Sequence, residues 1–290
     1  MFEMCADPST LEGLAWLACY LTNGKHFLFY QSFATVLGLL ALAAPMALLM
    51  GFAGALAKRS RILGLRQLGQ VYVAMVRGIP DIVFFLFVPL LIDQGIEIIR
   101  HYALCADTSA PIYQGNDFVV CQAAKMPLSS AEPWVHSLYG FFLALVAFSI
   151  VFGAFAANTL DGALSAVPAS QLETARAYGM TPRQAFWRIQ LPQMWGYALP
   201  GLANLWQILI KATPLLFLLG IEDIVYWARE LGGAKGSRFD YPHPDWRIYY
   251  FGALLLFYML MTWGSEKFFV RMQARLSVGQ ATLSGKGAGL

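Results

Sequence analysis

Charged side chains are scarce in this sequence. They account for 13% of the 290 residues, whereas hydrophobic residues account for 58% and the mean hydropathy is +0.55. Soluble domains carry about 25% charged residues. This composition therefore excludes an ordinary soluble fold.

Several functional classes also lack their usual signals. The chain has four cysteines and four histidines but neither a CxxC motif nor a histidine cluster in sequence, so no metal site is predicted. No nucleophile–base pattern is present, so no catalytic residues and no enzymatic activity are expected. The nearest match to a phosphate-binding loop, Gly285-Lys286-Gly287, lacks the following Ser or Thr and a correctly spaced first glycine. The acidic N-terminus predicts no cleavable signal peptide.

Five apolar runs are long enough to cross a bilayer, which takes about 20 residues each. They are residues 30–56, 68–92, 138–160, 194–219 and 247–270. The sequence therefore predicts an all-α integral membrane protein with five transmembrane helices.

Basic residues are concentrated in the segments that follow the first, third and fifth predicted spans. They are Lys58, Arg59, Arg61 and Arg66; Arg176, Arg183 and Arg188; and Lys267, Arg271, Arg275 and Lys286. The other segments are mixed or acidic. The positive-inside rule therefore predicts an outer N-terminus and a cytoplasmic C-terminus.

All four cysteines fall on the predicted outer side, where disulfides persist. Cys105 and Cys121 bracket a polar insert in the second outer loop. A disulfide there would close a short loop and contribute about 3 kcal/mol, and two free thiols are the alternative. Cys5 and Cys19 are a second, weaker candidate pair.

Helix-breaking residues interrupt the second predicted span. Arg77, Gly78 and Pro80 precede Asp81, and charges near hydrocarbon are costly unless they face protein or water. One interpretation is a kinked helix in which Arg77 reaches the interface and pairs with Asp81. The other is a helix broken beside a translocation path.

Polar residues also lie in the third and fourth predicted spans. Asn158 and Asp161 can share one helical face, and Asp161 would suit a basic ligand. Alternatively, Asp161 caps a turn at the interface. Lys211 requires a partner such as Asp81 or Asp161, a water-filled cavity or a substrate carboxylate. The predicted substrate path comprises Asp81, Asn158, Asp161, Gln207, Lys211 and Thr213.

A polar segment of about thirty residues, 165–192, separates the third and fourth spans. Ser170, followed three residues later by Glu173, predicts a capping box that starts a short helix. Gly179 predicts the left-handed residue that ends it.

A second short helix is expected directly afterwards. Thr181 and Pro182 predict its start as N-cap and first helical residue. It should end before Leu191-Pro192, because the residue before proline is pushed out of helical geometry. Together the two helices would form a compact cytoplasmic knob.

This segment resembles the coupling loop of ABC importer permeases, which has an E-A-A triplet, a glycine and a closing I-x-L-P. The matching residues are Glu173, Thr174 (in place of alanine), Ala175, Gly179, Ile189, Leu191 and Pro192. Further matches are Arg77-Gly78-Ile79-Pro80, Asn204-Leu205-Trp206-Gln207 and Lys211-Ala212-Thr213. From about residue 30 to 278 the chain is similar to polar amino-acid permeases, particularly the Q-type subunit of histidine and lysine–arginine–ornithine importers.

The resemblance implies a type I ABC importer fold in a bacterial inner membrane. It also implies a second permease subunit, in a heterodimer or homodimer, two cytoplasmic ATPases that hold ATP and Mg, and a periplasmic amino-acid-binding protein. The implied function is uptake of a polar amino acid or related derivative by ATP-driven alternating access, and Asp161 favours a basic ligand. Two features depart from the family: Asn158 and Asp161 replace an acidic residue and an arginine, and the outer insert is long.

Two other functions remain open. An ion-coupled secondary transporter could use Asp81, Asp161 and Lys211 as a relay, although the chain lacks the internal repeats typical of such carriers. A non-transporting membrane anchor would leave these charges without a purpose. In the preferred interpretation, residues 1–29 are a periplasmic segment, 30–278 the permease domain and 279–290 a flexible cytoplasmic tail. The outer insert spans about 93–137 and the coupling loop about 165–192.

Overall fold

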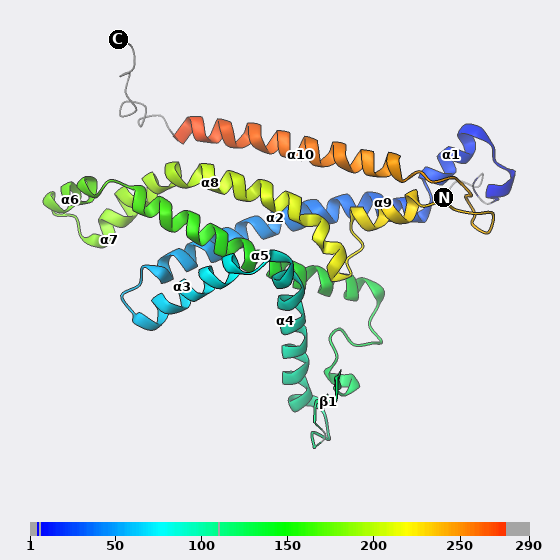
Figure 1. The fold of residues 1–290 in the computed structure, drawn as a ribbon, viewed down its shortest axis with the longest axis horizontal. Coiled ribbons are helices and arrows are strands. Elements are labelled where there is room, and N and C mark those ends of the chain that lie inside the picture. The colour runs from blue at the N-terminus through cyan, green and yellow to red at the C-terminus, as the bar shows by residue number, and fades with distance from the viewer. Residues whose placement is uncertain (1–4, 6, 110, 277–290) are drawn as a thin grey trace, which may run out of the picture. The chain divides into compact units, whose positions relative to one another are not determined.

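The computed structural model describes residue 5 and residues 7–109 and 111–276. The predicted tail 279–290, with Lys286 and the 285–287 segment, lies outside the described residues, as does Val278. Five helical stretches in the described part are long and apolar enough to cross a membrane, as expected. They are Gly24–Lys58, Asp81–Leu104, Pro133–Ala166, Pro182–Leu219 and Arg247–Leu276 (Figure 1).

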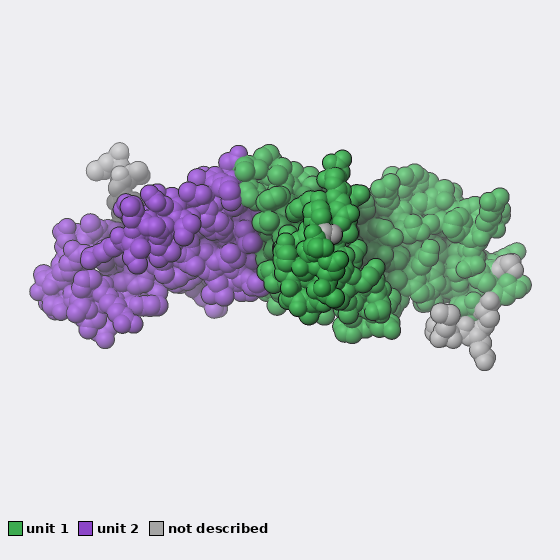
Figure 2. Space-filling view, turned by 90° about the horizontal axis from the view of Figure 1, so that it is seen from below, with its two compact units in different colours: residues 1–43, 79–148, 213–254 green, residues 44–78, 149–212, 255–290 purple. Residues whose placement is uncertain are grey.

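The chain forms two compact units, each assembled from three separate segments (Figure 2). Unit 1 comprises Met1–Ala43, Ile79–Phe148 and Thr213–Leu254. Unit 2 comprises Ala44–Gly78, Ser149–Ala212 and Leu255–Leu290. Three of the five boundaries fall inside α2 (Gly24–Lys58), α5 (Pro133–Ala166) and α10 (Arg247–Leu276), so each of these helices contributes to both units.

Unit 1 contains short helices around the longer ones and a small β-hairpin. Its complete elements are η2 (Pro8–Thr10), α1 (Gly13–Leu21), α4 (Asp81–Leu104), β1 (Tyr113–Gln114), β2 (Asp117–Phe118), η3 (Gln122–Ala124), η5 (Thr213–Leu219) and α9 (Ile224–Gly232). The two strands are antiparallel, with Tyr113 opposite Phe118. Disulfides join Cys5 to Cys19 and Cys105 to Cys121.

An aromatic cluster fastens α1 to the rest of unit 1. Its members, here called the Tyr20 cluster, are Trp16, Tyr20, His26, His243, Trp246 and Tyr250. The Tyr20 hydroxyl donates to the Leu231 carbonyl at 3.1 Å and lies 3.2 Å from His243 Nε2. The Tyr250 hydroxyl donates to Tyr20 at 3.1 Å. Since burying a tyrosine requires a partner for its hydroxyl, these bonds fix the position of α1.

Unit 2 contains the rest of the three shared helices and five complete elements. These are α3 (Leu63–Gly78), α6 (Ala169–Ala177), α7 (Pro182–Ala185), the π-helical turn η4 (Phe186–Gln190) and α8 (Leu191–Ala212). Small residues bring α2 and α5 close together. A Cβ added at Gly51 would lie 2.6 Å from Ala156 Cβ, and one at Gly153 would lie 2.8 Å from Met50 Cβ. Small residues in a membrane helix allow such close packing.

The second predicted span needs a correction. A single helix over residues 68–92 is wrong, because α3 ends at Gly78 and α4 begins at Asp81, with Pro80 extended at φ −55° and ψ 133°. Proline disfavours helical geometry at the preceding residue, here Ile79. α3 is an amphipathic helix whose apolar residues lie on one face. These residues made the predicted span begin at residue 68, inside α3, although the helix long enough to cross the membrane begins at Asp81. Arg77, Gly78 and Pro80 mark the break itself.

Many large apolar side chains on the long helices are exposed. α10 has only Leu254 buried among its described residues. Such surface is rare on soluble monomers and is suited to lipid or to partner helices.

Candidate functional site

The polar segment between the third and fourth membrane helices folds into two short helices, α6 and α7. Figure 1 shows them between the end of α5 and the start of α8; residues 169–190 are called the knob below. Gly179 has φ +79°, a value that glycine adopts without strain. Its N–H donates to Arg176 O at 2.9 Å, and Met180 N–H donates to Ala175 O at 3.1 Å. This pair of bonds is a Schellman motif, so Gly179 ends α6 as predicted.

The two helix starts differ in how well they were predicted. Thr181 is the N-cap of α7, and a capping box joins it to Gln184, with Pro182 at the first helical position. The capping box expected at Ser170 and Glu173 is wrong. Pro168 is the N-cap of α6, and Ser170 lies inside the helix, where its carbonyl accepts the Thr174 hydroxyl at 2.8 Å.

The second short helix does not end before Pro192. Instead, α7 continues through η4 directly into α8, so one helical stretch runs from Pro182 to Leu219. In the π turn the Leu191 N–H donates to Phe186 O, five residues back. Pro192 lies ten residues into this stretch and directly after the π turn, whose bonds five residues back interrupt the regular pattern that a proline would otherwise break. The predicted end was wrong because the π turn absorbs this proline.

The knob is fixed to the membrane helices of unit 2. Gln190 Nε2 donates to Leu164 O, near the end of α5, at 3.1 Å. Phe186 and Leu191 pack against a buried core that consists of Ala55, Leu160, Ala163, Leu164, Val167, Met194 and Ala198. Interiors packed in this way transmit displacement rather than absorb it. A force on the knob would therefore reach α5 and α8.

The knob presents large aromatic side chains to the surroundings. Tyr178 is 84% exposed and Trp187 is 55% exposed. A hollow of about 300 Å³ lies between its parts, lined by Ser170, Gln171, Thr174, Ala175, Tyr178, Met180, Ile189 and Gln193. Exposed aromatic residues beside a hollow are typical of protein-binding surfaces. The sequence of this segment already predicts exposed alanine, methionine and aromatic side chains that could fill a partner's groove, although not which aromatic residues are the most exposed.

The residues predicted to couple to an ATPase are spread over this surface. Glu173, Thr174, Gly179 and Pro192 are exposed, Ile189 and Leu191 are half-buried, and Ala175 is buried. The exposed members could contact a partner, whereas Ala175 is confined to packing within the knob.

Asp161 is the centre of an ion cluster that joins α2 to α5. Its carboxylate accepts Lys58 Nζ at 2.6 Å and Arg59 Nε at 2.7 Å. Arg59 also donates to the Asp161 carbonyl at 2.8 Å and to the Ser165 hydroxyl. Because Asp161 lies within α5, the interpretation that it caps a turn is wrong. Sequence reasoning missed Lys58 and Arg59 as its partners, since they are about a hundred residues distant.

The other predicted substrate residues lie on several elements. In unit 2, Asn158 is on α5, and Gln207 and Lys211 are four residues apart on α8. No hydrogen bond or ion pair between described residues of this unit joins Asp161 to Lys211, so that expected pair is not formed. In unit 1, Asp81 begins α4 and Thr213 begins η5.

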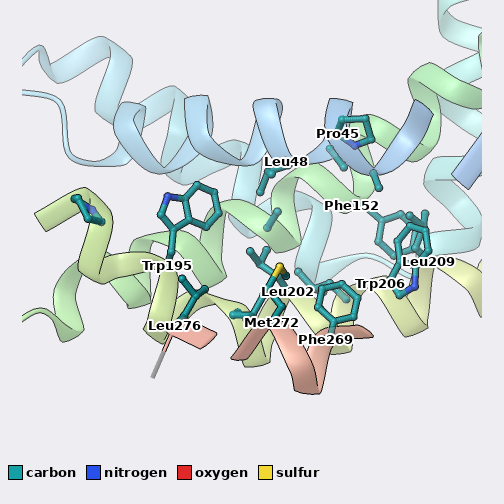
Figure 3. A pocket seen from close by; sticks show the side chains of 16 residues that line it. Pro45, Leu48, Phe152, Trp195, Leu202, Trp206, Leu209, Phe269, Met272 and Leu276 are labelled. Atoms are coloured by element: carbon teal, nitrogen blue, oxygen red, sulfur yellow. The ribbon is translucent and has the colours of Figure 1, made fainter. Parts of the chain in front are cut away.

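A separate hollow of about 600 Å³ lies in unit 2 between α2, α5, α8 and α10. Its wall is formed by Ala44, Pro45, Ala47, Leu48, Phe152, Ala156, Pro192, Trp195, Leu199, Leu202, Leu205, Trp206, Leu209, Phe269, Met272 and Leu276. Figure 3 shows these side chains facing one another. Trp206 Nε1 donates to Ser265 Oγ at 2.8 Å, so the single polar atom of this tryptophan side chain already has a partner. None of the predicted substrate residues lines this hollow, and its apolar wall does not suit a polar ligand.

Comparison with known proteins decides the family. Residues 43–262 match the family model described as "binding-protein-dependent transport system inner membrane component". The chain belongs to this family of membrane permeases. The permease is 32% identical to the histidine/lysine/arginine/ornithine transport system permease HisQ of Salmonella typhimurium, over 81% of this chain and 86% of HisQ. It is thus an inner-membrane permease subunit that acts with other components of an ABC transporter, and it is not itself the catalytic subunit.

Other relatives agree with this assignment. The arginine ABC transporter permease ArtQ of Escherichia coli is 29% identical over 66% of the permease and 74% of ArtQ. The nopaline transport system permease NocQ of Agrobacterium fabrum is 29% identical over 76% and 79% of the two chains. A crystal structure of an amino acid ABC transporter with histidines superposes with a TM-score of 0.61 at 22% identity, covering 92% of the permease and 99% of that chain. This structural likeness shows a shared fold.

Proposed function

We propose that the permease is the membrane subunit of a type I ABC importer for a polar amino acid or a related derivative, and that a basic ligand is favoured. The similarity to HisQ, ArtQ and NocQ carries this proposal. Asp161 supports it less than the sequence suggested, because Lys58 and Arg59 already neutralise its carboxylate. A second permease subunit, two ATPases that hold ATP and Mg, and a periplasmic binding protein would complete the importer.

The knob is the proposed docking point for an ATPase subunit. Its exposed Tyr178 and Trp187 offer apolar anchors, and Glu173 lies exposed on α6. Because the knob continues into α8 and is bonded to α5, ATP-driven movement of the ATPases would tilt both helices. Rocking of two permeases would then expose the substrate site to each side in turn.

This proposal places the knob and the C-terminus in the cytoplasm and the N-terminus outside. The basic residues beside the first, third and fifth membrane helices support that orientation. A membrane-impermeant thiol reagent tests it on chains with one introduced cysteine and the four native cysteines replaced by serine. In intact cells the reagent should label the Ser237→Cys chain but not the Gln184→Cys chain. The reverse result would overturn the orientation.

A reconstituted complex tests the transport function. The permease, purified with its ATPase and binding-protein partners, should take up labelled arginine or histidine into liposomes only when ATP is supplied. Uptake driven by an ion gradient without ATP would instead establish the secondary transporter.

The same complex tests the coupling role of the knob. Gly179→Val forces a β-branched residue into the left-handed region, and Glu173→Ala removes an exposed charge. Both should reduce ligand-stimulated ATP hydrolysis while the complex remains assembled. Gly162→Ala is the matched control, because a Cβ at Gly162 meets no atom within 4 Å. Unchanged hydrolysis in both knob variants would refute the coupling role.

A further inference from the structure

The C-terminal end of α4 and the loop that follows it bring one histidine and two cysteines together. His101 and Cys105 are four residues apart, on one face of α4 and at its C-cap. Cys121 approaches from the far end of the loop. One ligand atom from each of the three residues lies within 4.8 Å of the other two.

A set of hydrogen bonds holds this loop end against α4 without help from the disulfide. Arg100 donates to Ala124 O at 3.1 Å and to Ala123 O at 2.7 Å. Glu97 accepts the Met126 N–H at 3.1 Å. Glu97, Arg100 and His101 therefore form a scaffold on which Cys121 stays beside Cys105 when their bond is cut.

His101 faces the two cysteines. Its Nδ1 lies 3.2 Å from Cys105 Sγ and 3.5 Å from the Cys121 backbone N–H. The residue is only 6% exposed, and its Nε2 has no hydrogen-bond partner among the described residues. A buried imidazole with so few partners is unusual, because buried polar atoms are normally bonded. The ring atom that faces the two sulfur atoms is Nδ1, and it accepts the Cys121 N–H, so it presents a lone pair on the side where the cysteines lie.

We propose that reduction of the Cys105–Cys121 disulfide creates a zinc site whose ligands are Cys105 Sγ, Cys121 Sγ and His101 Nδ1. Two thiolates and one imidazole are a ligand set that zinc accepts, with water in the fourth position. Zinc bonds of about 2.0–2.3 Å place neighbouring ligand atoms less than 4 Å apart, so after reduction the two sulfur atoms need to separate by about 2 Å, while His101 Nδ1 already lies 3.2 Å from Cys105 Sγ. This inference does not depend on the proposed transport function.

The chemistry balances with a dithiol as the reductant. The dithiol gives two electrons and two protons to the disulfide, becomes a cyclic disulfide, and leaves Cys105 and Cys121 as thiols. Zinc then replaces the two thiol protons, which pass to solvent. The loop is thus closed by a covalent bond when oxidised and by a metal when reduced.

The second disulfide provides an internal control. Among the described residues, Cys5 and Cys19 belong to no group of three ligands. The sequence alone predicted no metal site because it contains no CxxC motif. The overlooked signal was the spacing His-x3-Cys at the end of a helix, together with a third ligand that only the fold supplies.

Cobalt substitution tests the proposal on the full-length permease in detergent, without a histidine tag. The protein is reduced with a trialkylphosphine, which becomes the phosphine oxide, and is titrated with Co²⁺. One Co²⁺ per chain with a thiolate charge-transfer band, displaced by Zn²⁺, is expected. The Cys5→Ser/Cys19→Ser variant should keep this band, and oxidised protein should lack it.

Ligand variants complete the test. His101→Ala and Cys121→Ser should each weaken Zn²⁺ binding by at least the roughly 10–100-fold loss that outer-shell changes cause. Each variant that elutes as a monodisperse peak from size-exclusion chromatography tests the proposal by itself. If one variant does not fold, the other still gives a result. Binding that is unaffected in these variants, that requires Cys5 and Cys19, or that never appears after reduction would overturn the proposal.

Discussion

The Tyr20 cluster in unit 1 and the knob in unit 2 are fastened by different means. Beside the Tyr20 cluster, α1 is tied by a disulfide and by a chain of aromatic hydroxyl and imidazole bonds. The knob contains no cysteine and is fixed by helix caps, one side-chain bond to α5 and apolar packing. Covalent cross-links suit a part that must keep its shape, whereas caps and packing suit a part that moves as a body. Four mutational experiments, two on each unit, test how the two units are stabilised.

The largest effect is expected in unit 2, at the ion cluster. Asp161→Asn leaves Lys58 and Arg59 without their carboxylate. The three side chains are 19–34% exposed, so the loss should reach up to about 3 kcal/mol, the lower end of the range for fully buried pairs. The unfolding temperature in detergent should fall. Lys58→Met combined with Asp161→Asn should recover part of the loss, which a double-mutant cycle measures. An unchanged unfolding temperature in Asp161→Asn would mean that the cluster adds nothing to stability.

A slightly smaller effect is expected from the cross-link in unit 1. Cys5→Ser with Cys19→Ser opens a loop of about 15 residues and should cost about 2–3 kcal/mol. The loss should appear as a lower unfolding temperature, while ATP hydrolysis by the assembled complex stays the same. If ATP hydrolysis fell instead, the segment closed by the Cys5–Cys19 disulfide would also contribute to the coupling between the permease and the ATPases.

Asp223 makes the stability of unit 1 depend on pH. It is the buried N-cap of α9 and accepts two backbone N–H groups, but burial raises its pKa to about 6. As the pH rises, the Asp223 carboxyl ionises near pH 4 in the unfolded chain and only near pH 6 in the folded chain. The stabilising contribution of this group is therefore complete below pH 4 and is lost as the pH rises to 6.

Asp223→Asn tests this dependence, since asparagine is an equally good N-cap. The difference in unfolding free energy between the variant and the native chain should grow by about 2 kcal/mol in favour of the variant between pH 4 and pH 6.5. A constant difference over that range would contradict the raised pKa.

The smallest effect is expected at the start of α7. Thr181→Ala removes the N-cap and should cost about 1 kcal/mol, whereas Thr181→Ser keeps the hydroxyl. Hydrogen exchange at Gln184 should become faster in the alanine variant alone. Equal exchange in both variants would show that packing, rather than the cap, orders the knob.

The parts of the fold that depend on local sequence could be predicted. Apolar runs indicated five membrane helices, and Gly179 and the Thr181-Pro182 pair indicated the turn and the start of α7. The errors arose where two local signals compete: proline ends many helices, but a π turn directly before Pro192 lets the helix continue past it. Likewise the apolar face of α3 was merged with α4 across Pro80.

The parts that depend on distant contacts could not be predicted. Nothing near Asp161 in the sequence indicates that Lys58 and Arg59 neutralise it, and that contact changes the candidate site most. The group of His101, Cys105 and Cys121 could be predicted in part. The spacing of His101 and Cys105 can be read from the sequence, but only the fold of the loop brings Cys121 beside them.

The uninterrupted passage from α7 through η4 into α8 has a mechanical consequence. Residues 182–212 form one continuous helical stretch, with Pro200 inside α8, that is about 45 Å long at 1.5 Å per residue. A tilt of only about 5° at the knob would displace the far end of such a rod by about 4 Å. If the knob is the docking point proposed above, α8 would serve as a lever arm, and a flexible break inserted at η4 should leave ATPase binding intact while it abolishes transport.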